Sequence, residues 1–331
     1  MHVLTGLQND HCHQFDGPGA YEWWYADALD ACGEWGVVLI LFRGMPMSPD
    51  YLADPSSMHG GYAVSVYHRG VRIAFGFGGH PLESCHFDAD VARLNMPCGG
   101  LEVGSDGLTM SIEAPCGDDG RRVRVGIHMP EVRPAGQSPE QTTGPHAWVL
   151  AAARSAARVS VEIFEDHAPV VRHQFEALAY HDHNMGTRAM SCDFRDWYWG
   201  RVQGAHQTYV FLATRRSAHD STWFGQVLPN GHVESFEQVR LSLTRPRLAM
   251  FGLLHHRTIQ LSGVDAAGAV HTVECQNNVV CEDGPFYQRY ISEWTIGRHE
   301  TAYGMSEYMN VKRLARPWIR PFLRLPWMVS S

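Results

Sequence analysis

The segment Tyr21-Glu22-Trp23-Trp24-Tyr25-Ala26-Asp27 places four aromatic residues beside two carboxylates. As a β-strand it would turn Glu22, Trp24 and Ala26 to one face and the alternate residues to the other. On the inner face of a barrel, a carboxyl group beside Trp24 would be poorly solvated. We therefore expect a raised pKa for Glu22 and a role as general acid. Alternatively, Glu22 lies outside the barrel or pairs with an arginine.

A second segment of this kind is Tyr180-His181-Asp182-His183-Asn184-Met185-Gly186. On a strand, His181 and His183 would share one face and the alternate residues the other. We expect His183, together with Asn184 and Tyr180, to do acid–base or hydrogen-bonding work that orients a ligand in an apolar pocket.

The spacing of the histidines does not predict a metal site. A cupin-like site would need a carboxylate roughly three or four residues after a His-x-His pair. The chain has Gly186 and Thr187 there. The other pairs, His11-x-His13 and His255-His256, have no matching third ligand in the sequence. We therefore expect no metal ion.

Most of the chain consists of short apolar or alternating stretches separated by turn residues such as Asn230-Gly231 and Asp283-Gly284. Strands repeated about every ten residues are typical of antiparallel barrels or sandwiches. The sequence therefore predicts an all-β fold. The stretches expected to be strands are 37–42, 62–67, 71–77, 108–112, 123–127, 159–164, 208–213, 222–227, 239–243, 258–261, 270–275 and 287–294.

Helix-forming stretches are few. Residues 147–157 are rich in alanine and favour about three helical turns. The C-terminal stretch 311–325 carries five basic side chains among apolar ones, and two prolines interrupt it. This stretch either packs across the mouth of a barrel or contacts a membrane surface.

The length of 331 residues predicts two domains of about 150 residues each. We place the boundary in the breaker-rich segment 166–169. This gives an N-terminal domain of residues 1–168 and a C-terminal domain of residues 169–331.

Composition excludes several classes of function. A net charge of −8 offers no basic surface for nucleic acids. The single lysine, Lys312, lacks the glycine-rich surroundings of a phosphate-binding loop. Eight irregularly spaced cysteines without a Cys-x-x-Cys pair do not fit a zinc ribbon. No leader pattern and no long apolar run is present, so we expect a cytoplasmic protein.

The two segments described first resemble those of the carotenoid 1,2-hydratase (hydroxyneurosporene synthase) family, which is itself similar to the lipocalin-type Diels–Alderases of natural-product pathways. The family's Tyr-Glu-Trp-Trp-Tyr opening matches residues 21–25. Its Tyr-His-Asp-His-Asn-Trp-Gly motif matches residues 180–186, with Met185 in place of the tryptophan. Weaker matches follow in order: Trp197-Tyr198-Trp199-Gly200-Arg201, Pro285-Phe286-Tyr287-x-Arg289 and Gly304-Met305-Ser306-Glu307-Tyr308.

The resemblance implies two tandem lipocalin-like antiparallel β-barrels, an apolar ligand pocket, and neither a metal nor an organic cofactor. It also implies an acid that protonates a terminal isoprene alkene, followed by capture of the cation by water. The implied residues are the motif histidine, the tryptophan two positions later and a Tyr-x-Asp on a following strand. These correspond here to His183, to Met185, and to Tyr209 with Phe211 at the aspartate position.

Because Phe211 occupies the position of the family's aspartate, the proton has to come from another acid. Asp182, Glu22 and Asp27 are the candidates, with His183 and Tyr209 as catalytic partners. The expected reaction is acid-initiated hydration or cyclisation of a terpenoid- or carotenoid-like polyene. The alternatives are a cofactor-free pericyclase or isomerase and a non-catalytic binder of hydrophobic ligands. The residues expected to contact the substrate are Trp23, Trp24, Tyr25, Tyr180, Asn184, Met185, Trp197, Trp199 and Phe211.

Overall fold

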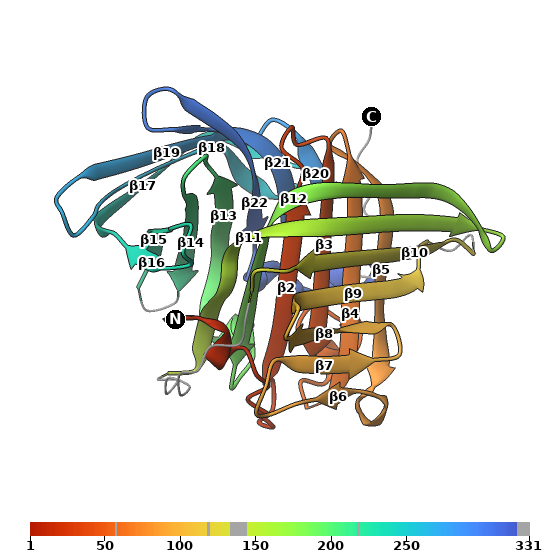
Figure 1. Ribbon diagram of the computed structural model, residues 1–331. Coiled ribbons are helices and arrows are strands. Elements are labelled where there is room, and N and C mark those ends of the chain that lie inside the picture. Colours follow the sequence, from red (N-terminus) through yellow and green to blue (C-terminus); the bar gives the residue numbers. More distant parts are fainter. Residues whose placement is uncertain (57, 118–119, 133–143, 217–218, 323–331) are drawn as a thin grey trace. The chain divides into compact units, whose positions relative to one another are not determined.

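The computed structural model describes residues 1–56, 58–117, 120–132, 144–216 and 219–322. Within them the chain is built almost entirely of strands, arranged in two large sheets (Figure 1). The prediction of an all-β protein is therefore confirmed. The chain divides into two compact units. The first comprises Met1–Asp30, Trp35–His68 and Ile73–Met190, and the second comprises Ala31–Glu34, Arg69–Arg72 and the chain from Ser191 onward.

The first unit is built on a sheet of twelve strands in the order β5-β4-β3-β2-β12-β11-β10-β9-β8-β7-β6, with β1 paired in parallel to β11. Strands β2 and β12, far apart in the sequence, lie side by side (red and green in Figure 1). The strands are β1 (His2–Thr5), β2 (Tyr21–Leu29), β3 (Trp35–Arg43), β4 (His59–His68), β5 (Val71–Pro81), β6 (His86–Phe87), β7 (Arg93–Met96), β8 (Gly99–Gly104), β9 (Gly107–Pro115), β10 (Arg122–Met129), β11 (His146–Glu165) and β12 (Ala168–Gly186). The short helical turns are η1 (Leu7–Asn9), α1 (Pro49–Ala53), η2 (Leu82–Ser84) and η3 (Met190–Cys192).

The second unit is built on a ten-stranded sheet in the order β16-β15-β14-β13-β22-β21-β19-β18-β17, with β20 paired to β21. The strands are β13 (Phe194–Gln203), β14 (Thr208–Arg216), β15 (Ser221–Val227), β16 (Val233–Ser235), β17 (Glu237–Leu248), β18 (Leu254–Val264), β19 (Val270–Gln276), β20 (Val280–Asp283), β21 (Tyr287–Ile296) and β22 (Glu300–Met309). Two short helical elements, α2 (Val311–Leu314) and η4 (Pro317–Phe322), follow the last strand.

The alanine-rich stretch 147–157 belongs to β11, so the prediction of a helix there was wrong. Strand β11 pairs with β12 along one edge and with β10 and β1 along the other. The helix preference of alanine is at most about 1 kcal/mol per residue. Because both edges of β11 are hydrogen-bonded and its residues 146–153 are all buried, this tertiary context overrides the local preference.

The segment 166–169, where the sequence suggested a domain boundary, contains the turn of the β11–β12 hairpin and the first residues of β12. Asp166 and His167 both have positive φ angles, 46° and 67°, and Glu165 pairs with Ala168 across the turn. Two central residues of this kind form the tight turns that join antiparallel strands. The residues after 168 continue as β12 in the first sheet, so the division into units lies further along the chain, after Met190.

Each unit has its own apolar core. In the first, Trp24, Leu39, Val64, Ile112 and Val125 come from five different strands, and all are fully buried. Burial of a side chain of this kind contributes about 1.5–3 kcal/mol. The second core is more aromatic and contains Tyr198, Tyr209, Phe211, Phe224, Phe236, Trp294 and Tyr308.

The C-terminal helical segment packs on the second unit. Ile319 is fully buried, and the guanidinium group of Arg313 donates hydrogen bonds to the carbonyl oxygens of Phe251 and Pro285. These contacts favour the packed tail over the membrane anchor as the interpretation of residues 311–322. Residues 323–325 of the same stretch lie outside the described residues, and contact with a membrane stays a prediction.

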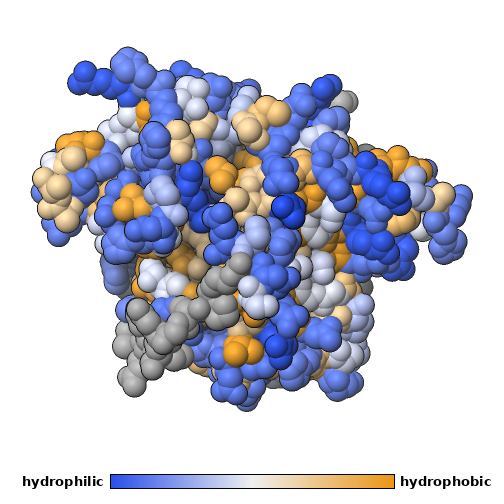
Figure 2. Space-filling model, in the orientation of Figure 1, coloured by the Kyte–Doolittle hydropathy of each residue, from blue (hydrophilic) through white to orange (hydrophobic). Residues whose placement is uncertain are grey.

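Among the described residues, no helix has the length and apolar character needed to cross a membrane. The face shown in Figure 2 is mostly hydrophilic, with hydrophobic residues scattered between the polar ones. Scattered apolar residues of this kind are ordinary on protein surfaces.

Candidate active site

The two segments that combine aromatic and ionisable residues are neighbours in the first sheet. Strand β2 pairs with β12 in a register that sets Trp24 opposite His183, Ala26 opposite His181 and Glu22 opposite Met185. Directly opposite residues share a face of the sheet. The prediction that both segments are strands with alternating faces is therefore confirmed, and their inner faces meet in the first core.

The carboxylate of Glu22 is completely buried and is held by the N-terminal segment before β2. The backbone N–H of His13 donates to Oε2 at 2.8 Å, and that of Gln14 donates to Oε1 at 3.0 Å. The thiol of Cys12 lies 3.4 Å from Oε1. Arg43, opposite Glu22 on β3, brings Nη1 to 3.8 Å from Oε1 and forms a closer pair with Asp16.

These contacts overturn one expectation about Glu22. Burial alone would raise the pKa of the carboxyl group. However, interactions with the imidazoles of His13 and His183 and with the backbone N–H of His13 outweigh burial and hold the pKa well below its usual value. Glu22 is thus an ionised carboxylate, and the prediction of a raised pKa was wrong.

His183 is fully buried and stacks on the indole ring of Trp24, with 4.2 Å between the ring centroids. Its Nε2 lies 3.3 Å from Oε2 of Glu22, and its Nδ1 lies 3.7 Å from Oδ1 of Asp10. Burial lowers the pKa of His183 below its ordinary value, although both carboxylates act in the opposite direction.

His181, on the same face of β12, is also fully buried. Its Nε2 lies 2.8 Å from Oδ2 of Asp10, and its Nδ1 lies 2.8 Å from the carbonyl oxygen of Tyr25. Burial acts to lower the pKa of His181, but the attraction and hydrogen bond of Asp10 outweigh burial and raise it. Asp10 therefore stands between the two histidines of the motif.

The opposite face of the same strands carries a second buried carboxylate, Asp182. It accepts hydrogen bonds from Nε1 of Trp148 at 2.8 Å, from the hydroxyl of Tyr180 at 2.7 Å and from Nδ2 of Asn184 at 2.9 Å. Three donors favour the ionised form of a carboxyl group.

The remaining expected residues of the first unit divide between the two faces. On the face of Asp182, the hydroxyl of Tyr25 donates to Oδ2 of Asp27 at 2.9 Å. Trp23 stacks on Tyr21 with 5.0 Å between their centroids. On the inner face, Met185 is buried in a small apolar cluster with Leu4, Ala147, Val149 and Ala151.

The other expected site residues belong to the second unit and not to the β2–β12 pair. The hydroxyl of Tyr209 lies 3.0 Å from Nδ1 of His271, and burial raises the pKa of the phenol. Phe211 is buried in the second core, 6.0 Å from the Trp294 ring. Trp197 packs edge-on against Phe194, and Trp199 is buried on the same strand, β13.

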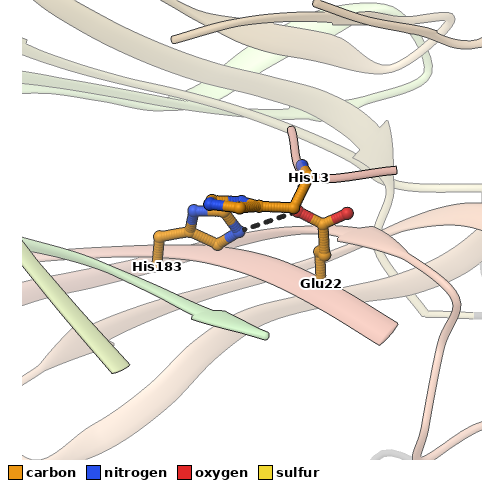
Figure 3. A group of neighbouring side chains, drawn as sticks. All are labelled: His13, Glu22 and His183. Atoms are coloured by element: carbon orange, nitrogen blue, oxygen red, sulfur yellow. Dashed lines mark hydrogen bonds and ion pairs between the residues drawn. The ribbon is translucent and has the colours of Figure 1, made fainter. Parts of the chain in front are cut away.

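Three side chains that meet at the inner face of the first sheet could hold a metal ion, a possibility that the histidine spacing in the sequence did not predict. The ligating atoms of His13, Glu22 and His183 lie within 4.8 Å of one another. Figure 3 shows how the three side chains converge, with the carboxylate of Glu22 beside the ring of His183. Imidazole and carboxylate are the groups with which proteins bind zinc in catalytic sites.

A sequence model of the family described as "Carotenoid hydratase CrtC" matches residues 120–328, which is more than half of the chain. The chain belongs to this family. The matched range includes the whole of β12 and so the motif that carries His183. Membership confirms the predicted resemblance and the prediction of an enzyme of the hydratase class.

Two individual relatives extend the likeness over nearly the whole chain. The hydroxyneurosporene dehydrogenase of Chlorobaculum tepidum is 28% identical over 94% of this chain and 87% of its own length. The acyclic carotenoid 1,2-hydratase of Thiocapsa roseopersicina is 26% identical over 94% of this chain and 73% of its own length. A solved structure of a putative AttH protein from Nitrosomonas europaea shares the fold, with a TM-score of 0.63 and 13% identity over 92% of this chain and 96% of that one. The prediction of a lipocalin-like fold is thereby confirmed.

Several residues of this candidate site could not be recognised in the sequence. Asp10 and Gln14 lie in a segment with no strand or helix pattern, so nothing indicated that they cover the inner face. Arg43 could have been found from the β2–β3 hairpin register, which sets it opposite Glu22. His13 was noticed in a His-x-His pair, but its partner carboxylate becomes visible only in the folded chain.

Proposed function

We propose that the protein is a hydratase that adds water across a carbon–carbon double bond of an acyclic carotenoid or a similar apolar polyene. The observation that carries this proposal is the family match over residues 120–328. A relative named acyclic carotenoid 1,2-hydratase aligns with 94% of the chain, which supports the same reaction type.

The reaction joins a proton to one alkene carbon and a hydroxyl group to the other, so that one water molecule accounts for all the atoms added. The cation formed in between has to be kept from competing reactions, which favours an apolar, enclosed site. The β2–β12 pair carries buried ionisable groups on both of its faces, and on the inner face His183 stacks on Trp24 of the first apolar core. We therefore assign the reaction to this pair, with His183 on one face and Asp182 on the other as the residues to test.

The reaction can be tested with purified protein and an acyclic carotenoid such as lycopene dispersed in detergent. Chromatography with mass spectrometry should reveal a product heavier by one water molecule, and water labelled with heavy oxygen should transfer its label to that product. A new product of unchanged mass would identify an isomerase or cyclase instead. Bound carotenoid without any new product would identify a binding protein.

Two substitutions locate the reaction on the strand pair. His183→Ala should lower turnover by about a hundredfold or more if this side chain takes part in the chemistry. His173→Ala, on the same strand but remote from the inner polar group, is the matched control and should keep turnover. Asp182→Asn tests the opposite face in the same assay. If both His183→Ala and Asp182→Asn kept full activity, the assignment of the reaction to the β2–β12 pair would be wrong.

A further inference from the structure

Two histidine pairs, His11-x-His13 and His181-x-His183, each direct one ring to the same buried point beside Glu22. We propose that Nδ1 of His13, Nε2 of His183 and Oε2 of Glu22 bind one divalent transition-metal ion of the zinc class. Three protein ligands of this type leave a coordination position for water. Binding of the ion is independent of the hydratase function, although a water held there would be the natural one to add to a double bond.

The two distances from Glu22 to the imidazole nitrogens fit an ion. Oε2 of Glu22 lies 3.5 Å from Nδ1 of His13 and 3.3 Å from Nε2 of His183. Ligands bound about 2.0–2.2 Å from zinc are separated by about 3–4 Å. Both ring nitrogens are buried and make no hydrogen bond to any of the described residues. The three donors thus converge at separations compatible with a shared ion, with Oε2 of Glu22 facing a nitrogen of each ring.

His181 is a buried histidine of the same core whose ring nitrogens both find hydrogen-bonding partners without an ion. Both of its ring nitrogens have hydrogen-bonding partners at 2.8 Å, one on Asp10 and one on the backbone of Tyr25. His183 is buried to the same extent two residues later, but neither of its nitrogens makes a hydrogen bond within the described part of the chain. The ring nitrogens of His183 instead face the carboxylates of Glu22 at 3.3 Å and Asp10 at 3.7 Å, and an ion held between Nε2 and Glu22 would satisfy the buried ring.

The surroundings hold the donors in a ligating orientation. Oδ1 of Asp10 faces Nδ1 of His183 at 3.7 Å and makes no hydrogen bond to the described residues. A carboxylate behind a ligating imidazole is the usual second partner of a zinc-bound histidine. The backbone N–H groups of Gln14 and His13 fix the carboxylate of Glu22 by binding Oε1 and Oε2, and Oε2 also faces the two imidazoles. Stacking on Trp24 fixes the ring plane of His183.

The carboxylate of Glu22 is available to bind an ion, because the neighbouring basic side chains pair with other carboxylates. Arg43 lies 2.6 Å from Asp16 but 3.8 Å from Glu22, and His181 lies 2.8 Å from Asp10. Arg43 and His181 therefore each lie close to a carboxylate other than Glu22. A dication bound by Glu22 and two neutral imidazoles would carry a net charge of about +1, as in zinc sites with the same ligands.

The metal site can be tested on the whole, tag-free protein by elemental analysis and by cobalt spectroscopy. We expect about one equivalent of zinc or a similar ion to be retained after gel filtration. After removal of the ion with a chelator, titration with Co²⁺ should give visible absorption bands that saturate at one equivalent. Addition of Zn²⁺ should raise the Tm of the ion-free protein, since binding to the folded state alone stabilises it.

Matched variants decide whether the named atoms are the ligands. His13→Ala, in the most accessible of the three positions, and His183→Ala should each weaken Co²⁺ binding by about tenfold or more. His173→Ala removes an imidazole that lies far along β12 from the three donors, and it should leave binding unchanged. Circular dichroism shows which variants are folded, and His13→Ala remains informative if His183→Ala does not fold. Absence of a retained ion together with absence of a saturable Co²⁺ spectrum, or equal binding by wild type and His13→Ala, would overturn the assignment.

Discussion

His181 and Asp10 form a buried pair that joins the middle of β12 to the N-terminal segment. Nε2 and Oδ2 are 2.8 Å apart, and neither side chain is accessible to solvent. The other ring nitrogen faces the carbonyl oxygen of Tyr25, which can only accept a hydrogen bond. Burial acts to lower the pKa of His181, but Asp10 outweighs burial and raises it, which favours a protonated ring opposite the carboxylate. This pair fixes the segment that brings His13 and Gln14 to the inner face.

Asp10→Asn should lower the free energy of unfolding by about 3–5 kcal/mol, because it leaves the buried charge of His181 without its partner. Asp16→Asn is the control, since Asp16 is 82% exposed in its pair with Arg43 and should cost less than about 1 kcal/mol. Urea denaturation in the presence of a chelator measures both values without any contribution from bound ions. Equal, small losses in the two variants would show that the His181–Asp10 pair does not stabilise the fold.

Asp182→Asn tests the carboxylate on the opposite face of β12. Oδ2 accepts hydrogen bonds from both Trp148 and Tyr180, so an amide nitrogen at either oxygen position meets at least one donor. We expect a loss of about 1–3 kcal/mol in the free energy of unfolding. Glu176→Gln, on an exposed stretch of the same strand, should change the stability by no more than about 0.5 kcal/mol. A neutral effect of Asp182→Asn would mean that the three donors find other partners.

The parts of the fold that the sequence predicts are those set by local periodicity. Alternation in 21–27 and 180–186 correctly indicated two strands. Within the first strand it placed Glu22 and Trp24 on a common face, and within the second it did the same for His181 and His183. The pattern does not encode which strands pair, and the register of β2 with β12 is what brings these residues together. The alanine-rich stretch in β11 was wrongly predicted to be a helix for the same reason. Its pairing with neighbouring strands, and not the helix propensity of alanine, decides its structure.

The candidate site was harder to predict than the fold, because its decisive groups come from irregular backbone. The pKa of Glu22 was expected to rise from burial beside Trp24, and burial does act in that direction. The opposing contacts include the backbone N–H groups of His13 and Gln14, which every residue but proline carries. A sequence pattern gives no sign of where such groups point.

His255 should make the second unit sensitive to acid. Burial lowers the pKa of His255 from 6.5 to about 4. Between these values the unfolded chain binds a proton that the folded protein does not, so stability falls as the pH falls from 6.5 toward 4. His255→Gln should reduce this loss by about 1–2 kcal/mol, after allowance for partial screening by solvent. The free energy of unfolding, measured from pH 7 to pH 4, tests this against the exposed control His232→Gln. Parallel pH profiles for the wild type and His255→Gln would contradict the expectation.

Phe211 occupies the position at which the family resemblance implies an aspartate, and the structure gives a reason to expect that restoring the acid would not restore the function. The side chain is 1% exposed in the second core and lies beside Trp294. Phe211→Asp would bury a charge among apolar neighbours, so we expect a loss of more than about 4 kcal/mol and poor recovery of folded protein. Phe211→Leu keeps the site apolar and should cost only about 1–2 kcal/mol. Urea denaturation of the two variants separates the effect of charge from that of lost volume. If Phe211→Asp proved as stable as Phe211→Leu, a polar partner would have to be available to the carboxylate, and position 211 would again be a candidate for the proton donor.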